Sequence, residues 1–387
     1  LLALTGGIAD AAPFGLPDPG PITRWGLPVA RAVRDAATAV ALGALSLITF
    51  LLPAGKSGLL SKPQLKLAWL ATAAGSAWLW SAVTEFVLSY SDLAGQPPLA
   101  ASTVQLRFFA TEMELGRSLA WNILLAGLVA FLAVSARTVT GIAIGLTAGV
   151  VGLWSVALTG HAADDANHDL AVNAQFVHLL AIGLWLGGLV ALLWIRRHPD
   201  LDLAVAAGRY STMAGWCYAG VAVSGLIAAV LRISTPNGML STYGALLAVK
   251  IVAFTALGCL GWWQRRRILT NLDDSGRRRW FTWFALVELG FMALAAGAGT
   301  ALSRTPPPEG TEAVTPTPGE ALLGYPMPPP LGLSEWFTQW RIDSFWTPVA
   351  IAAAIAYLAA VWRLRRRGDR WSRGRAVAWL IGCAGLV

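Results

Sequence analysis

The chain has 387 residues, of which 56% are hydrophobic and only 13% are charged, whereas soluble domains average about 25% charged residues. Runs of about twenty apolar residues recur along it, as in proteins that cross a membrane by helices. These runs are too long, and alternate too little, to be barrel strands. The sequence therefore predicts an all-α fold, a polytopic transmembrane helical bundle, and excludes a soluble globular domain.

The apolar runs place the predicted spans along the chain. A helix tail occupies residues 1–9, and a last span starts near 375 and is cut by the end of the sequence. Because the chain lacks an initial Met and both ends are apolar, we expect a fragment at both ends. Between these two partial spans, nine full spans are predicted at about 30–52, 65–89, 117–135, 139–160, 174–195, 211–231, 242–263, 280–302 and 344–362.

The loops between these spans alternate in charge. One set is basic and includes the runs at 265–267, 277–279 and 363–375, whereas the other set holds most of the acidic residues. Because Lys and Arg concentrate in cytoplasmic loops, the basic set is predicted to be cytoplasmic and the acidic set external. The net charge of +8 then reflects orientation and contacts with anionic lipids, and we expect no nucleic-acid partner.

Three of the four histidines, with three aspartates, fall in one short segment that is predicted to be external. A short loop between the spans 139–160 and 174–195 would bring their side chains together. Imidazole and carboxylate groups are common metal ligands. The spacings match no closed zinc motif, and a solvated polar loop whose histidines cap helices is the alternative. The candidate metal ligands are His161, His168, His178, Asp164, Asp165 and Asp169.

His178 is predicted to lie about one turn inside the span 174–195. On a helix it shares a face with Trp185, seven residues further on, and the adjacent Gly187 and Gly188 allow a second helix to approach closely. An ionisable residue at membrane depth is a candidate functional residue. His178 is therefore the most informative of the three histidines.

Three other charged residues are predicted inside the membrane. Lys250 lies about nine residues from the outer end of its span, and Glu288 lies about eight from the inner end of the next. Because an unpaired charge there is costly, we expect these two to form an ion pair that faces the bundle interior. Glu85 lies near the outer end of its span, and we expect its side chain to reach out to water.

The composition changes at residues 305–332, which are Pro-rich and are predicted to form an extended external linker. We therefore predict N-terminal transmembrane helices over 1–158, a second transmembrane domain over 159–304, the linker, and the start of another membrane domain over 333–387. The three cysteines lie far apart in apolar segments, so we expect no disulfide. The five methionines form no MxxxM cluster, so we expect them to serve packing.

Residues 208–303 resemble the copper resistance D (CopD) domain of bacterial inner-membrane proteins. Three segments carry this resemblance. The second contains the pattern YG-x-LL-x-x-K, which includes Lys250, and the third contains Glu288. Upstream, GHA and FVHLLAIGLWLGGL resemble the usual lead-in of the family, which includes His161 and His178. The three segments are GRYSTMAGWCYAGVAVSGLIAAVLRI, TYGALLAVKIVAFTALGCLGWWQRRRI and VELGFMALAAGAGTALSRTPPP.

After the linker, residues 345–382 resemble the start of a CtaG-type domain, a family linked to copper delivery during cytochrome c oxidase assembly. The similarity rests on the FW-x-P start, on Tyr357 and on the basic turn RRRG-x-RW-x-x-GR. Only the first helix and a half of such a domain is covered. A CopD–CtaG fusion is typical of actinobacterial membrane proteins.

These resemblances imply a multi-pass inner-membrane protein that binds copper at the external His cluster. Copper would be transported across the membrane or delivered to cytochrome c oxidase assembly. The implied partners beside the lipid bilayer are the oxidase, its assembly factors or an external copper chaperone. No nucleotide-binding motif or Ser/His/Asp set is present, so we expect no enzymatic activity. Two alternatives stay open: a metal-free scaffold for respiratory or cell-envelope complexes, and a redox protein in which paired histidines hold haem.

Overall fold

A computed structural model gives the fold, and it describes residues 18–53, 58–157, 168–232, 242–267 and 275–302, with three isolated positions after them. The chain forms two compact units. One comprises residues 1–160 and 175–311, and the other comprises residues 161–174 and 312–387. The packing described below is that of the first unit.

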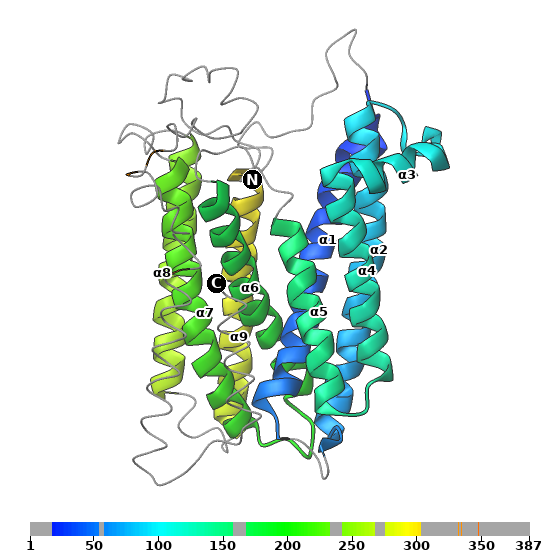
Figure 1. The fold of residues 1–387 in the computed structure, drawn as a ribbon. Helices are drawn as coiled ribbons and strands as arrows, with labels where there is room; N and C mark the ends of the chain where they lie inside the picture. Colours follow the sequence, from blue (N-terminus) through cyan, green and yellow to red (C-terminus); the bar gives the residue numbers. More distant parts are fainter. Residues whose placement is uncertain are drawn as a thin grey trace. The chain divides into compact units, whose positions relative to one another are not determined.

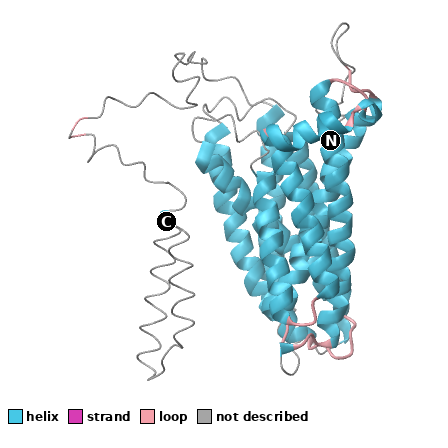
Figure 2. Cartoon of the chain, turned by 45° about the vertical axis from the view of Figure 1, so that its right-hand side comes forward, coloured by secondary structure: helices cyan, strands magenta, loops and turns pink. Residues whose placement is uncertain are grey.

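The described residues form long helices and no β-strand (Figures 1 and 2). Apolar side chains dominate each helix, and internal hydrogen bonding of the backbone is what a hydrocarbon environment requires. In chain order the helices are α1 (Pro21–Ser46), a π-helical turn (Leu47–Leu51), α2 (Lys62–Ala94), α3 (Thr103–Glu112), α4 (Glu114–Ser135), α5 (Val139–Ala157), α6 (His168–Ile195), α7 (Leu203–Arg232), α8 (Thr242–Arg267) and α9 (Ser275–Leu302).

The predicted all-α transmembrane bundle is confirmed, because seven described helices are long and apolar enough to cross a bilayer. These are α1 with its π-helical turn, α4, α5, α6, α7, α8 and α9. The predicted span 65–89 lies within α2, which is 33 residues long but less apolar, because Trp, Ser, Thr and Gly interrupt its aliphatic residues. The predicted spans at 1–9, at 344–362 and after 375 lie outside the described residues.

The first five helices form a bundle in which α1 packs on α2, α2 on α4, α4 on α5, and α5 back on α1 (Figure 1). Its interior contains a polar network that is fully buried. Trp78 Nε1 donates to Asn122 Oδ1 at 3.0 Å, and the Asn122 amide donates to the Gly152 carbonyl at 2.9 Å. Such internal pairing is favoured because hydrocarbon offers no water to satisfy these groups.

Glu85 is buried in this bundle, which corrects the expectation that its side chain reaches water. Its carboxylate pairs with the buried Arg34 guanidinium and also accepts from Arg31 Nε at 3.1 Å. Arg34 in turn binds Asp35 at 2.8 Å. The sequence prediction began the first span at residue 30 and overlooked the two arginines, whereas α1 begins at Pro21 and carries both toward α2. A buried pair of this kind is costly to break, because either partner alone is a desolvated charge.

Two neighbouring glycines of α6 allow close packing on two sides, one against the first bundle and one against α7. A Cβ at Gly187 would lie 1.7 Å from the Ala39 carbonyl oxygen of α1, so the two backbones touch there. A Cβ at Gly188 would lie 2.8 Å from the Tyr210 ring of α7. The predicted role of this glycine pair in close packing is confirmed, and α6 is held on one side by α1 and on another by α7.

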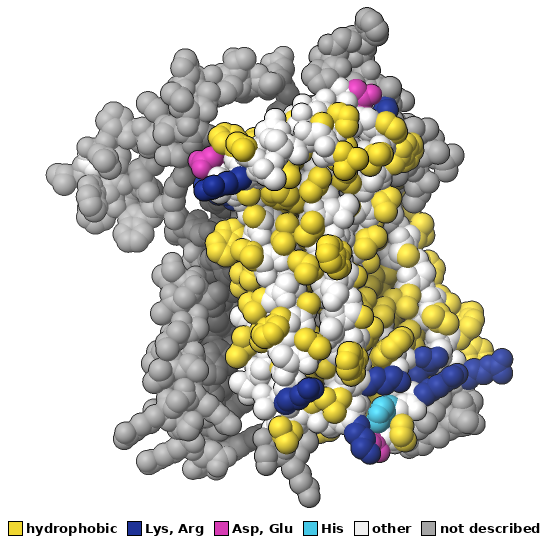
Figure 3. Space-filling view, turned by 90° about the vertical axis from the view of Figure 1, so that its right-hand side faces the viewer, with side chains coloured by type: hydrophobic (Ala, Val, Ile, Leu, Met, Phe, Trp, Pro, Cys, Tyr) yellow, Lys and Arg dark blue, Asp and Glu magenta, His cyan; other side chains and the backbone are white. Residues whose placement is uncertain are grey.

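The surface has the character of a membrane protein. On the face in Figure 3, hydrophobic side chains cover the middle, and Lys and Arg gather near the lower end. Large apolar side chains are widely exposed, such as Trp216 at 77% and Trp80 at 70%. Exposed apolar patches of this extent mark a lipid-facing or partner-facing surface.

We predict that Gly187→Ala destabilises the protein by about 1–3 kcal/mol or more, because its methyl group would overlap the Ala39 carbonyl. The matched control is Gly261→Ala, in another apolar helix, where a Cβ meets nothing within 4 Å and helix propensity improves slightly. Thermal unfolding in detergent, followed by Trp fluorescence, measures both. Equal melting temperatures for the two variants would contradict the close α1–α6 contact.

Candidate metal-binding site

His178 lies on α6 and contacts α7 through a hydrogen bond with Ser224. The distance between His178 Nδ1 and Ser224 Oγ is 3.0 Å. The Ser224 hydroxyl donates its own proton to the Gly220 carbonyl at 2.7 Å, as serines in membrane helices commonly do. Ser224 Oγ is therefore the acceptor, and His178 Nδ1 is the donor. In the neutral ring this leaves Nε2 with a free lone pair.

The described surroundings of His178 come from α7 and α8. Ser224 is 2% exposed, and the ring carbon Cε1 of His178 lies 3.9 Å from the position of a Cβ at Gly225. Lys250 of α8 lies within electrostatic range of the ring. The Lys250 Nζ also lies 3.7 Å from the position of a Cβ at Gly299, on α9. His178 therefore lies in the interior of the α6–α9 group.

The expected ion pair between Lys250 and Glu288 is not formed. The ammonium group of Lys250 lies beside Gly299, which is eleven residues beyond Glu288 on α9, a rise of about 16 Å. Glu288 instead lies within electrostatic range of the Tyr210 hydroxyl of α7. The prediction assumed that the two side chains could bridge a height difference of several ångströms, but Lys250 extends toward the C-terminal end of α9 and away from Glu288.

His168 and Asp169 are the first two residues of α6, and nothing is described of their side chains. Within this helix, ten residues separate His168 from His178, a rise of about 15 Å. The helix therefore starts earlier than predicted, and His178 lies nearly three turns inside it. His168 and Asp169 remain predicted ligands.

The other candidate ligands, His161, Asp164 and Asp165, lie outside the described residues, in the segment 158–167. They remain predicted ligands. Among the residues that the structure does describe, no group of three or more His, Cys, Asp and Glu side chains is placed to hold a metal ion. Among the candidate ligands, His178 is therefore the one whose side chain the structure describes.

The alternative of a haem held by paired histidines gains no support from the described side chains. Beside His178, only His198 has a described side chain, and it lies in the turn that follows α6. Its Nδ1 accepts a hydrogen bond from the Asp200 backbone N–H at 3.2 Å. His198 lies twenty residues beyond His178, about 30 Å further along the direction of α6, so the two cannot be axial ligands of one haem.

Sequence reasoning missed Ser224 and Tyr210. Serine and tyrosine within an apolar helix are common, and neither stands out until the facing residue is known. The Tyr210 hydroxyl of α7 donates a hydrogen bond to the Trp185 carbonyl of α6 at 2.7 Å. Ser224 and His178 form a second hydrogen bond between the same two helices. A signal was present in the spacing, since 210, 217 and 224 recur every seven residues on one face of α7.

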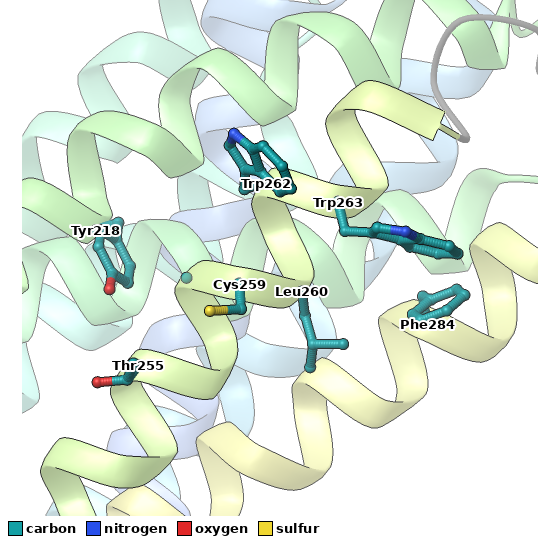
Figure 4. A pocket seen from close by; sticks show the side chains of 8 residues that line it. Tyr218, Thr255, Cys259, Leu260, Trp262, Trp263 and Phe284 are labelled. Atoms are coloured by element: carbon teal, nitrogen blue, oxygen red, sulfur yellow. The ribbon is translucent and has the colours of Figure 1, made fainter.

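A separate groove of about 660 Å³ lies along α8 and does not include His178 (Figure 4). The Tyr218 ring stacks on Phe254 with centroids 4.1 Å apart, and the Arg266 guanidinium lies 4.5 Å above the exposed Trp262 ring. An apolar groove with exposed Trp and a nearby Arg fits contact with lipid better than metal chemistry. Its lining residues are Tyr218, Thr255, Gly258, Cys259, Leu260, Trp262, Trp263 and Phe284.

Two family models match different parts of the chain. Residues 22–169 match the model of the copper resistance protein D-like, N-terminal domain, and residues 204–302 match the model of copper resistance protein D. The second match covers nearly the same residues as the CopD resemblance found in the sequence. Neither match extends past 302, so the CtaG-type resemblance of the last segment stays a prediction.

Curated relatives are mycobacterial. Uncharacterized proteins of Mycobacterium tuberculosis (strain CDC 1551 / Oshkosh) and Mycobacterium bovis (strain ATCC BAA-935 / AF2122/97) are each 28% identical over 395 residues, which cover 99% of this chain and 56% of the relative. An uncharacterized protein of Mycobacterium leprae (strain TN) is 26% identical over 377 residues, or 96% of this chain and 54% of the relative. The chain thus spans about half the length of these relatives. No solved structure matches it significantly.

We predict that Ser224→Ala releases the His178 ring from its Nδ1–H tautomer, because the acceptor for that proton is lost. Nitrogen NMR of protein labelled at histidine measures the tautomer, with His178→Gln used to assign the signal. The matched control is Thr212→Val on the same helix, whose hydroxyl bonds the Gly208 carbonyl but faces no histidine. An unchanged His178 signal in Ser224→Ala would contradict the hydrogen bond.

Proposed function

Because its described helices match both the N-terminal and the D domain of the copper resistance D family, we propose that this chain handles copper at the plasma membrane without enzymatic activity. Copper is its cargo, bound near the outer end of the α6–α9 group. It is then moved across the membrane or delivered to a partner. The family matches support the copper-related role, and the site and the direction of movement are our proposal.

The observation that carries this proposal is the orientation of His178. Its Nδ1 is held by Ser224, so its Nε2 lone pair is directed elsewhere in a partly buried, polar part of the interior. Imidazole nitrogen is a good copper ligand, and a hydrogen bond to the second ring nitrogen is the usual support for a metal-binding histidine. Packing alone requires no such support.

The remaining ligands have to carry negative charge. Lys250 lies within electrostatic range of His178, and its positive charge opposes binding of a second cation. The segment 158–167 directly precedes α6 and contains His161, Asp164 and Asp165. We propose that carboxylates of this segment complete the site, since they offset the lysine charge as well as binding the metal.

The distribution of charge supports the proposed orientation. The inner loops hold the basic runs, and Lys62 at the start of α2 is 81% exposed at its side chain and pairs only loosely with Asp200 at 3.5 Å. We propose that this end faces the cytoplasm and that the segment 158–167 and the Pro-rich linker face outward. Copper would therefore enter the α6–α9 group from the outside.

Delivery to cytochrome c oxidase assembly is the finer form of the proposal. It rests on the resemblance of residues 345–382 to a CtaG-type domain, joined in one chain to copper resistance D domains. In that arrangement, copper that enters through the first domains reaches the assembly machinery of the oxidase. An external copper chaperone is the corresponding donor.

The second candidate function is a metal-free scaffold for respiratory or cell-envelope complexes. A specific observation favours it, namely the Lys250 ammonium beside His178, which makes this position unfavourable for a lone metal cation. The broad exposed apolar surface suits contacts with other membrane proteins as well as with lipid. Metal analysis separates the two functions directly.

We predict that His178→Ala weakens Cu(II) binding by more than about tenfold. Loss of a residue that only supports a metal ligand already lowers the affinity about 10–100-fold, and His178 is proposed to be a ligand itself. The electron paramagnetic resonance spectrum of Cu(II) bound to the full chain in detergent should show one nitrogen coupling fewer in this variant. His198→Ala is the matched control, because His198 lies at the other end of α6 and supports only its own turn. Identical Cu(II) binding by both variants, or none by the unaltered protein, would favour the scaffold.

We predict that Lys250→Met strengthens Cu(II) binding by roughly tenfold, because a like charge in a medium of low dielectric is removed. The control is Lys62→Met, which removes the same charge from an exposed position at the inner end. Competition with a chelator of known affinity measures both. Weaker binding in Lys250→Met alone would mean that the lysine supports the site rather than opposing the metal.

A further inference from the structure

The groove along α8 ends beside two arginines. Its lining on α8 runs from Thr255 to Trp263, which are eight residues and about 12 Å apart along the helix axis. Arg265 and Arg266 follow within one turn of Trp263, and both side chains are exposed. The groove therefore joins an apolar part at membrane depth to a basic end at the terminus of the helix.

Each of the two guanidinium groups lies against a wall of this groove. Arg266 stacks over the ring of Trp262, a lining residue, with its guanidinium carbon 4.5 Å from the ring centroid. Arg265 reaches toward α7, where its Nη1 lies 4.0 Å from the position of a Cβ at Gly215. Tyr218 forms the α7 wall and lies one turn beyond Gly215 on the same face. Two walls of the groove therefore each end at a positive charge.

These two charges are available to an anionic ligand. Among the residues that the structure describes, neither Arg265 nor Arg266 forms an ion pair. Stacking on Trp262 covers one face of the Arg266 guanidinium and leaves the edge with its N–H donors free. That edge is the part of a guanidinium that binds phosphate oxygens in pairs. The basic end therefore suits a phosphate group.

The rest of the groove suits an apolar chain. Three helices line it, with Tyr218 on α7, Cys259 on α8 and Phe284 on α9 (Figure 4). The Tyr218 ring stacks on Phe254 and makes an edge contact with Trp185 of α6 at 5.7 Å, so this wall is held in place from two sides. The groove volume of about 660 Å³ lies within the roughly 300–1,000 Å³ of small-ligand pockets.

A ligand that fits both parts has a long apolar chain joined to an anionic phosphate. We propose that the groove binds one anionic phospholipid, with an acyl chain along α8 and its phosphate at Arg265 and Arg266. A neutral membrane helix would also cover the apolar part, but it would leave the two arginines without a counterion. In the proposed orientation this end faces the cytoplasm, where anionic lipids attract basic groups. The lipid site does not rest on the proposed copper function, because the groove excludes His178.

The test is lipid binding to the delipidated full chain in detergent, measured by native mass spectrometry. One phosphatidylglycerol should bind per chain at least about fivefold more tightly than phosphatidylcholine with the same acyl chains, because the choline ammonium offsets the phosphate charge. Arg266→Gln should weaken phosphatidylglycerol binding about fivefold and leave phosphatidylcholine binding unchanged. The matched control is Arg137→Gln, which removes the same charge from an exposed position between α4 and α5. Equal affinity for the two lipids, or equal losses in the two variants, would overturn the site.

Cys259→Trp tests the apolar part, because an indole at this exposed position fills the groove while both arginines stay. It should weaken binding of both lipids, and unchanged phosphatidylglycerol binding would overturn the proposal. Melting temperatures of Cys259→Trp and Arg266→Gln in lipid-free detergent should equal that of the unaltered protein. Added phosphatidylglycerol should raise the melting temperature of the unaltered protein more than that of either variant.

Thiol labelling shows what covers the groove. In a Cys217→Ser/Cys383→Ser background, phosphatidylglycerol should slow the reaction of Cys259 with a maleimide several-fold. A Cys259 that resists the maleimide before any lipid is added would mean that a helix of this chain or of a second copy covers the groove, which overturns the proposal. His178→Ala should bind phosphatidylglycerol normally, so the lipid site and the proposed copper site are tested separately.

Discussion

The backbone contact between α6 and α1 fixes the geometry of everything that follows in the second half of the chain. Gly187 lies against the Ala39 carbonyl, and Gly188, its neighbour, receives the Tyr210 ring of α7. Because neither residue has a side chain, α6 can approach both helices, and its height and rotation are set on both sides. With α6 fixed in this way, His178 lies opposite Ser224 and Trp185 lies opposite Tyr210.

The polar groups of the interior are satisfied to different degrees, and this difference separates structural from functional positions. Trp78 with Asn122, and Arg34 with Glu85, are paired inside the first bundle and hold it together. In the α6–α9 group the pairing is less complete. His178 keeps one ring nitrogen for another partner. Polar groups left open at membrane depth are the places where a cargo ion can bind.

The copper resistance D matches cover α1 to α5 and α7 to α9, whereas most of α6, which carries His178, lies between them. In the site proposed above, carboxylates of the segment that precedes α6 join the nitrogen of His178. Lys250 lies within electrostatic range of His178, and its ammonium group lies beside Gly299, near the C-terminal end of α9. In the proposed site, a positive charge there would raise the free energy of a metal ion at His178 and so limit how tightly an incoming ion is held.

The sequence by itself determined the helices, the membrane class and the role of the glycine pair, because hydropathy and helical period are properties of neighbouring residues. It did not determine the partners of charged side chains. Glu85 pairs with Arg34 instead of reaching water, and Lys250 does not reach Glu288. Ser224 beside His178 was equally hidden. Only the tertiary structure decided these contacts, because they depend on the relative height and rotation of two helices, which packing between backbones sets and sequence spacing within one helix does not contain.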